Sequence, residues 1–147
     1  MSEWLAIPML LAGGLFAGGV VVIAWERVPA WLEADVSEFR MAFAYTLRRV
    51  DRLQPALLVA CLVSTIGFVM SADGAARSSA LFAAAGFLIV LVGSVALLIP
   101  IQRRLVAPRA QQPSEIERLR SRWVRGHLIR TLISLAALTL AIIAIVR

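Results

Sequence analysis

Four long apolar runs alternate with polar segments along the chain. The runs lie near residues 4–25, 55–72, 81–101 and 128–146 of the 147-residue sequence. A helix of about 20 residues is needed to cross ~30 Å of hydrocarbon, and each run is close to that length. The pattern predicts an all-α integral membrane protein, folded as one domain over residues 1–147 into a four-helix bundle.

The polar connections at residues 26–54 and 102–127 have helical patterns of their own. In the first, Asp35 and Glu38 have the spacing of a capping box, and apolar residues then recur at helical intervals. Pro29 is expected to end the first membrane helix. We therefore predict an amphipathic helix outside the membrane, between the first two spans.

The second connection leads into the last membrane helix. Pro100 is expected to kink or end the third span, and Ser114 with Glu117 forms a second capping box. One helix is predicted from about Glu115 to near the C-terminus. Its first turns would stand outside the membrane or lie against the other polar connection.

Pairs of glycines mark two membrane helices as closely packed. Gly14 and Gly18 lie four residues apart, and Gly86 and Gly93 lie one heptad apart. Small residues let helix backbones approach each other in lipid. We expect the Gly14–Gly18 pair to pack inside the bundle, and a dimer face is the less favoured alternative.

Composition and charge suggest an orientation. Hydrophobic residues make up 61% of the chain and the mean hydropathy is +0.85, far above a soluble domain. Of 15 arginines, 13 lie in or at the edge of the two long connections. Because basic loops stay in the cytoplasm, we expect both connections inside and both termini outside a cell membrane, such as a bacterial inner membrane. The net charge of +6 is expected to contact lipid headgroups rather than nucleic acid.

Several membrane chemistries lack the residues they need. The chain has one histidine, His127, one cysteine, Cys61, and no lysine. These numbers disfavour a haem held by two histidines, a thiol–disulfide pair and a retinal Schiff base. The apolar runs contain no carboxylate, which disfavours proton-coupled export. We expect neither a metal nor a cofactor.

The strongest candidate site lies at the start of the last apolar run. Trp123, His127 and Arg130 stand at i, i+4 and i+7, on one face of a helix. Histidine titrates near neutrality, so His127 is a candidate acid or base. Arg130 lies about one turn inside the apolar run and is a candidate for stabilising an oxyanion. Trp123 is expected to contact the substrate.

Three further polar residues flank the expected cytoplasmic ends of other spans. Gln102, Arg103 and Glu26 are candidates for substrate binding. Glu26 is also a candidate ion-pair partner for Arg130 or for Arg27. The structural alternative is that all these groups anchor the helices at the membrane edge, where long arginine side chains extend to water.

Four segments carry a family resemblance. They are the glycine-rich residues 11–20 with Val28-Pro29-Ala30, Arg52-Leu53-Gln54-Pro55, residues 99–105 and residues 122–131. With them the chain resembles the family of small four-helix membrane proteins that includes the anthrone oxygenases. The family's usual Pro-x-Asn pattern is altered here, since Gln102 stands in place of asparagine. The resemblance implies a four-helix bundle and, for some members, cofactor-free oxygenation of an anthrone to an anthraquinone. His127 and Arg130 suit the base and oxyanion roles of that reaction.

Two functions from different classes follow. The first is a small membrane oxygenase that acts without metal on an aromatic or quinone-like lipophile. The second is a non-catalytic membrane subunit or scaffold that docks a larger complex through its arginine-rich cytoplasmic loops. The expected partners are membrane lipids, with the lipophile in the first case and a protein complex or a homo-oligomer in the second. No nucleic acid is expected.

Overall fold

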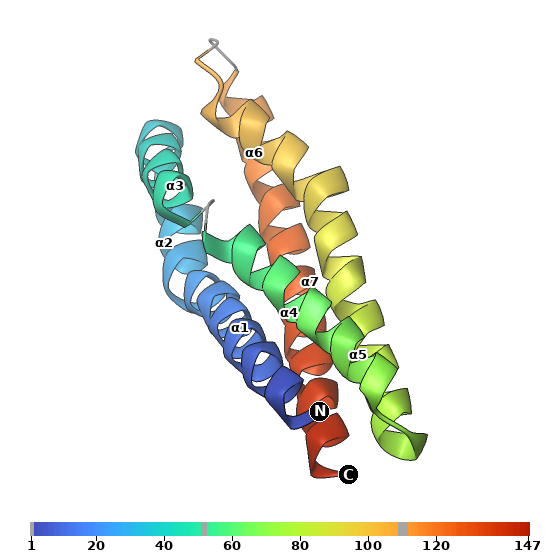
Figure 1. Cartoon of the computed structure of the whole chain (residues 1–147). Helices are drawn as coiled ribbons and strands as arrows, with labels where there is room; N and C mark the ends of the chain where they lie inside the picture. The colour runs from blue at the N-terminus through green and yellow to red at the C-terminus, as the bar shows by residue number, and fades with distance from the viewer. Residues whose placement is uncertain (1, 51–52, 109–111) are drawn as a thin grey trace.

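The described chain is helical almost throughout. The computed structural model describes residues 2–50, 53–108 and 112–147 (Figure 1). Short connections join the helices within these ranges. The α-helices are α1 (Ser2–Val22), α2 (Val28–Glu33), α3 (Val36–Val50), α4 (Leu53–Ser71), α5 (Gly74–Gly93), α6 (Ile99–Val106) and α7 (Pro113–Val146), with π-helical turns at Ile23–Arg27 and Ser94–Leu98.

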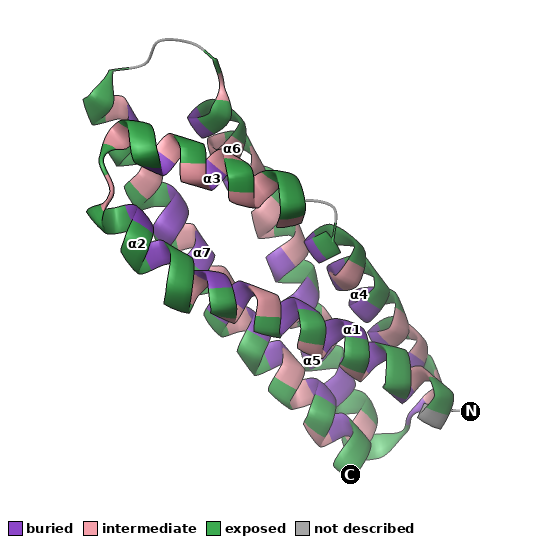
Figure 2. Cartoon of the chain, turned by 90° about the vertical axis from the view of Figure 1, so that its left-hand side faces the viewer, coloured by how far each residue is buried: buried purple, intermediate pink, exposed green. Residues whose placement is uncertain are grey.

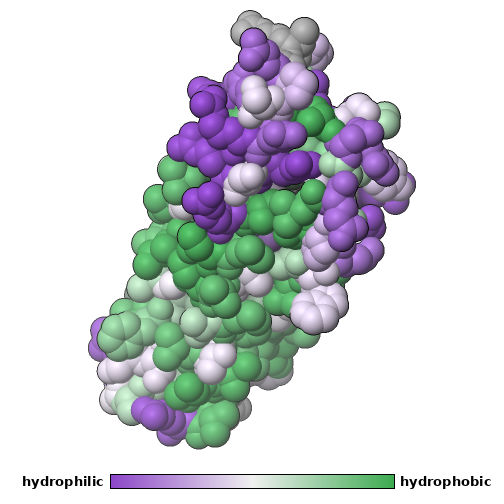
Figure 3. All heavy atoms as spheres, turned by 180° about the vertical axis from the view of Figure 1, so that it is seen from behind, coloured by the Kyte–Doolittle hydropathy of each residue, from purple (hydrophilic) through white to green (hydrophobic). Residues whose placement is uncertain are grey.

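Four long apolar helical segments confirm the predicted fold class. The segments able to cross a membrane by length and composition are Trp4–Glu33, Leu53–Ser71, Gly74–Val106 and Pro113–Val146. Helix α1 packs against α4, and α5 packs against α7 and α4. The N- and C-termini lie at the same end of the bundle (Figure 1). Polar surface gathers at the opposite end, and apolar surface covers much of the remainder (Figure 3). The protein is an all-α, multi-pass membrane bundle.

Pro29 and Pro100 fall inside long helical segments without ending them. Proline has no N–H, and its ring would clash with the carbonyl four residues earlier. Ahead of Pro29 the chain widens into a π-turn, in which the Val28 N–H donates to the Ile23 carbonyl oxygen. The same arrangement precedes Pro100. The expectation that the first helix ends at Pro29 is wrong, because the π-turn accommodates the ring and the helix continues to Glu33.

The starts of α3 and α7 differ. At α3, the Asp35 carboxylate accepts hydrogen bonds from the Glu38 N–H (2.8 Å) and the Ser37 hydroxyl (2.8 Å). These bonds lower the pKa of Asp35 and confirm the predicted cap. Helix α7 begins at Pro113, which suits a first helical turn, and no described side chain caps it. The predicted capping box at Ser114 is wrong, whereas the single long helix is confirmed.

The Gly14–Gly18 pair does not pack inside the bundle. A Cβ atom added at either glycine would meet nothing within 4 Å. A Cβ at Gly13 would lie only 2.9 Å from the Cys61 Sγ atom. Gly13 and the fully buried Ala17 therefore form the inner face of α1, and the expected packing of Gly14 and Gly18 is wrong.

An aromatic cluster fills the polar end of the bundle, where α2, α3 and the first turns of α7 converge. Trp31, Phe43 and Trp123 are buried and meet edge to face. Their ring centroids are 5.1, 5.6 and 4.9 Å apart. Buried positions on these elements face inward, and the outer faces are exposed (Figure 2). This cluster gives the polar end its own core, separate from the packing of the membrane helices.

Two arginines hold the ends of the short helices α2 and α6. Arg120 of α7 donates to the carbonyl oxygens of Trp31 (3.0 Å) and Ala34 (2.9 Å), at the C-terminus of α2. Arg40 of α3 donates to the Leu105 carbonyl oxygen (3.1 Å) and to the carbonyl oxygen of Ala107, the C-cap residue of α6. A cation is favourable at the unpaired carbonyls of a helix C-terminus. Each half of the chain thereby stabilises a helix of the other half.

Candidate functional site

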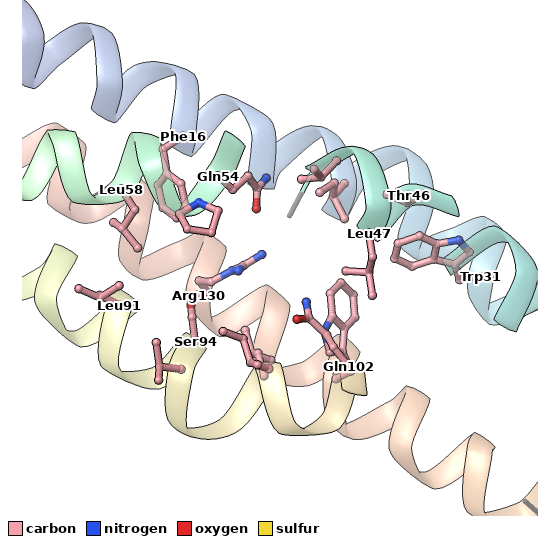
Figure 4. A pocket seen from close by; sticks show the side chains of 17 residues that line it. Phe16, Trp31, Thr46, Leu47, Gln54, Leu58, Leu91, Ser94, Gln102 and Arg130 are labelled. Atoms are coloured by element: carbon pink, nitrogen blue, oxygen red, sulfur yellow. The ribbon is translucent and has the colours of Figure 1, made fainter. Parts of the chain in front are cut away.

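A partly open cavity lies where the membrane helices meet the aromatic cluster. It has a volume of about 80 Å³, and every α-helix and both π-turns contribute to its walls (Figure 4). Its lining residues are Phe16, Ile23, Trp31, Thr46, Leu47, Val50, Gln54, Pro55, Leu58, Leu91, Ser94, Val95, Leu98, Ile99, Gln102, Trp123 and Arg130. Most of these side chains are apolar, and the polar ones come from α3, α4, α6, α7 and the second π-turn.

Arg130 brings a guanidinium group to this cavity (Figure 4). Its Nη2 atom lies 2.9 Å from Nδ1 of His127, which is one turn earlier on α7. His127 is fully buried, and its Nε2 atom lies 3.1 Å from the Val20 carbonyl oxygen on α1. The imidazole therefore stands between the backbone of α1 and the guanidinium.

The two partners of His127 determine which ring nitrogen carries its proton. A carbonyl oxygen only accepts hydrogen bonds, so Nε2 carries the proton and donates it to Val20. A guanidinium only donates, so Nδ1 is unprotonated and accepts from Arg130. His127 is a neutral imidazole that fastens α7 to α1 and orients Arg130.

Trp123 also lines the cavity and stands against His127. Its ring stacks on His127 with centroids 4.8 Å apart and an interplanar angle of 11°. The side chain is 2% exposed, and its indole Nε1 has no hydrogen-bond partner among the described residues. An unpaired buried N–H costs about 1–3 kcal/mol. A ligand oxygen in the cavity would offset that cost.

Two amides complete the polar part of the lining. Gln54 lies in the first turn of α4 and Gln102 lies on α6, and both reach the cavity (Figure 4). Gln54 is only 9% exposed, and its side chain forms no hydrogen bond with any described residue. Ser94 is different, because its hydroxyl already donates to the Val90 carbonyl oxygen (2.6 Å). The amides are thus the neutral groups best placed to accept or donate to a ligand.

The structure unites some of the predicted site residues and separates others. Arg130, Trp123 and Gln102 line the cavity, and His127, which is not among the lining residues, contacts Arg130. Arg103 is exposed and lines none of the described cavities. The substrate-binding and catalytic roles of these residues stay predictions.

Glu26 takes the second of its two expected partners. It is exposed and forms an ion pair with Arg27, at 3.5 Å. Since Arg130 points into the cavity and contacts His127, the suggested Glu26–Arg130 pair is not formed. Glu26 instead lines a groove next to the cavity.

Sequence reasoning missed two components of the site. Gln54 stood within the Arg52–Pro55 motif but looked like a residue at the edge of a membrane span. Its burial depends on the packing of α4 against Gly19 of α1, which only the structure shows. A Cβ atom added to Gly19 would lie 3.2 Å from Nε2 of Gln54. The Val20 carbonyl, a backbone group, has no sequence signal at all.

Two surface grooves adjoin the cavity. One, of about 370 Å³, lies between α1 with its π-turn, α3 and α4, and it shares Ile23, Thr46, Val50 and Gln54 with the cavity. The other, of about 200 Å³, lies between α5 with its π-turn and α7, and it shares Ser94, Leu98 and Arg130. The cavity therefore adjoins both grooves through the residues that they share. Among the described residues, no group of three or more His, Cys, Asp or Glu side chains is placed to hold a metal ion.

Fold and cavity together define a multi-pass helical membrane protein with an internal site that presents cationic and amide donors. The sequence profile of the anthrone oxygenase family matches residues 41–140, more than half of the chain. The protein belongs to this family. The matched segment includes Gln54, Gln102, Trp123, His127 and Arg130. Searches of curated proteins and of solved structures gave no significant match.

Proposed function

We propose that the protein is a cofactor-free oxygenase that converts a planar, anthrone-type aromatic ketone to the corresponding quinone. The observation that carries this proposal is the contact between the half-buried Arg130 and the buried His127 at an apolar, aromatic-lined cavity. Membership of the anthrone oxygenase family supports the reaction class. The apolar lining suits fused rings, and the donors suit ring oxygens.

The reaction requires negative charge on the substrate oxygen. Loss of a methylene proton from an anthrone gives a carbanion whose charge is shared with the carbonyl oxygen as an enolate. We assign Arg130 to that oxygen, because a fixed guanidinium in an apolar cavity stabilises developing negative charge strongly.

The remaining steps balance without a cofactor. The carbanion transfers electrons to dioxygen and forms one carbon–oxygen bond, which gives a peroxide. Water accepts the methylene proton in the first step, and this proton is returned to the peroxide to give a hydroperoxide. Loss of water from the hydroperoxide then leaves a second carbonyl, so one methylene ketone and one dioxygen give one quinone and one water.

In this proposal His127 positions Arg130. The base role expected from the sequence requires a free lone pair, but Nδ1 accepts from the guanidinium and Nε2 already carries a proton. A neutral imidazole accepts a hydrogen bond from Arg130 without repelling it, whereas a charged imidazole would repel the guanidinium.

The test is oxygen uptake by the purified protein in lipid nanodiscs supplied with anthrone. We expect one dioxygen consumed for each anthraquinone formed, with loss of both in Arg130→Gln. Arg125→Gln is the matched control, because Arg125 is exposed on the same helix and lies outside the cavity. If uptake does not exceed that of empty nanodiscs, the oxygenase is refuted, and co-purification of a larger complex at fixed stoichiometry would favour the scaffold function.

We also propose that the protein lies in a cell membrane, such as a bacterial inner membrane, with both termini outside. The support is the gathering of arginines at the end opposite the termini. An impermeant maleimide should label Arg147→Cys in intact cells and should label Ser114→Cys only after permeabilisation. The native Cys61 is buried and gives little background. The reverse labelling pattern would invert the topology.

A further inference from the structure

The groove between α1, α3 and α4 is larger than the cavity it joins. Its volume is about 370 Å³, against about 80 Å³ for the cavity. Leu15, Val22 and Leu53 form exposed apolar walls, and Arg27 and Arg49 stand at a polar rim. The groove therefore combines an exposed apolar surface with charged groups at one end.

The cavity alone is too small for a fused-ring substrate. A dry cavity of about 150 Å³ holds a single benzene molecule. The cavity that Arg130 lines, at about 80 Å³, is smaller than that. A tricyclic ligand whose reacting edge reaches Arg130 must therefore leave its other rings in an adjoining groove.

Gln54 stands at the junction between groove and cavity. It lines both, is only 9% exposed, and its amide has no hydrogen-bond partner among the described residues. In Figure 4 the amide points toward the interior beside Arg130. The amide therefore offers a donor and an acceptor that no described residue uses, and a ligand with a polar atom could bind there.

We propose that a multi-ring aromatic lipophile enters from the bilayer through the groove between α1, α3 and α4, and that Gln54 selects ligands with a second oxygen remote from the reacting carbon. This inference rests on the proposed function and names its substrate class. The groove between α5 and α7 suits this ligand less well, because it is smaller, at about 200 Å³, and offers no amide. The larger groove is thus both entrance and outer half of the binding site.

Gly19 gives a direct test of the entrance. It lines the groove, and a Cβ there would lie 3.2 Å from Nε2 of Gln54. The neighbouring Gly18 is exposed, lies outside the groove, and a Cβ there would meet nothing within 4 Å. Gly19→Leu should obstruct the groove, and Gly18→Leu is the matched control on the same helix.

Binding can be followed with 1,8-dihydroxyanthraquinone, a product-like probe that is not turned over. Trp31 and Trp123 line the cavity, so bound probe should quench their fluorescence in stopped-flow mixing with nanodiscs. We expect Gly19→Leu to slow association by about tenfold or more, and Gly18→Leu to leave it unchanged. Val22→Phe, at an exposed wall position, is the second variant if Gly19→Leu does not fold. Equal rates in the Gly18 and Gly19 variants, or slowing only in Gly93→Leu of the other groove, would overturn the proposal.

Gln54→Met tests the selection step, because methionine has similar length but cannot form the amide hydrogen bonds. The affinity for 1,8-dihydroxyanthraquinone should fall about fivefold, the equivalent of one neutral hydrogen bond. The affinity for anthracene, which has the same rings and no oxygen, should not change. An equal loss for both ligands would refute recognition by Gln54. Probe binding without anthrone turnover would refute the oxygenase alone, whereas turnover unaffected by Gly19→Leu would refute the entrance alone.

Discussion

Replacing His127 by asparagine or by glutamine separates a positioning role from a catalytic base. Asparagine places its amide oxygen near the position of Nδ1, so His127→Asn keeps an acceptor for Arg130. Glutamine places its terminal amide near Nε2, so His127→Gln keeps a donor to the Val20 carbonyl and loses the acceptor. Neither amide is a base. The two variants therefore remove one contact each, the 3.1 Å bond to Val20 or the 2.9 Å bond to Arg130.

Loss of the contact to Arg130 should lower kcat, whereas loss of the contact to Val20 should lower the free energy of unfolding. A hydrogen bond to a charged group contributes about 1.5–3 kcal/mol, and a neutral one about 1 kcal/mol. If Arg130 acts in the transition state, loss of its support in His127→Gln should lower kcat by roughly 10- to 150-fold. His127→Asn should keep most of kcat and lower the free energy of unfolding by about 1 kcal/mol.

Oxygen uptake with anthrone gives kcat, and thermal unfolding in the same nanodiscs gives stability. A double variant adds a sharper criterion. If His127 acts only through Arg130, His127→Gln should cause no further loss in an Arg130→Gln background. If His127→Asn and His127→Gln both fall to the rate of empty nanodiscs while still binding the probe, His127 is the base and the positioning role is refuted.

Three further predictions concern stability. Arg40→Ala and Arg120→Ala each remove guanidinium bonds to helix-terminal carbonyls, and each should lower the free energy of unfolding by about 2 kcal/mol; melting temperatures equal to wild type would contradict this. Gly86→Ala brings a Cβ to 2.8 Å from a facing alanine Cβ and should cost about 1–3 kcal/mol, whereas Gly93→Ala has open space and should cost nothing in the same melts. Because the pKa of Asp35 is lowered, its cap stabilises α3 fully above the ordinary carboxyl pKa, and this stabilisation is lost as the pH falls through the lowered value. Asp35→Asn should remove the resulting loss of helicity at acid pH, measured by circular dichroism. An unchanged acid transition in this variant would rule out the cap as its source.

The parts of the site that share one helix could be predicted from the sequence. Trp123, His127 and Arg130 lie on one face because helical spacing alone puts them there. The partner of Glu26 could not be chosen in advance, because it depends on how α1 and α7 pack. Gln54 was missed for the same reason, since its burial is created by the approach of α1 to α4.

The membrane spans were predictable for a different reason, and their ends were not. Long apolar runs have few stable alternatives to a membrane helix, so the sequence locates all four. A proline normally signals a helix end, but whether a π-turn accommodates it depends on neighbours that cover the widened turn. The helices through Pro29 and Pro100 therefore continue to Glu33 and Val106 against the local signal.

These widened turns also explain where the cavity forms. Both π-turns line it, through Ile23 in the first and Ser94, Val95 and Leu98 in the second. A π-turn inserts an extra residue and displaces the side chains around it, so two of them facing one helix leave space that regular helices would fill. The facing helix is α7, which runs without interruption from Pro113 and carries the donors of the site. The interrupted helices thus supply the space and the continuous helix supplies the chemistry, which is why the His127–Arg130 pair can stand beside a cavity that adjoins two surface grooves.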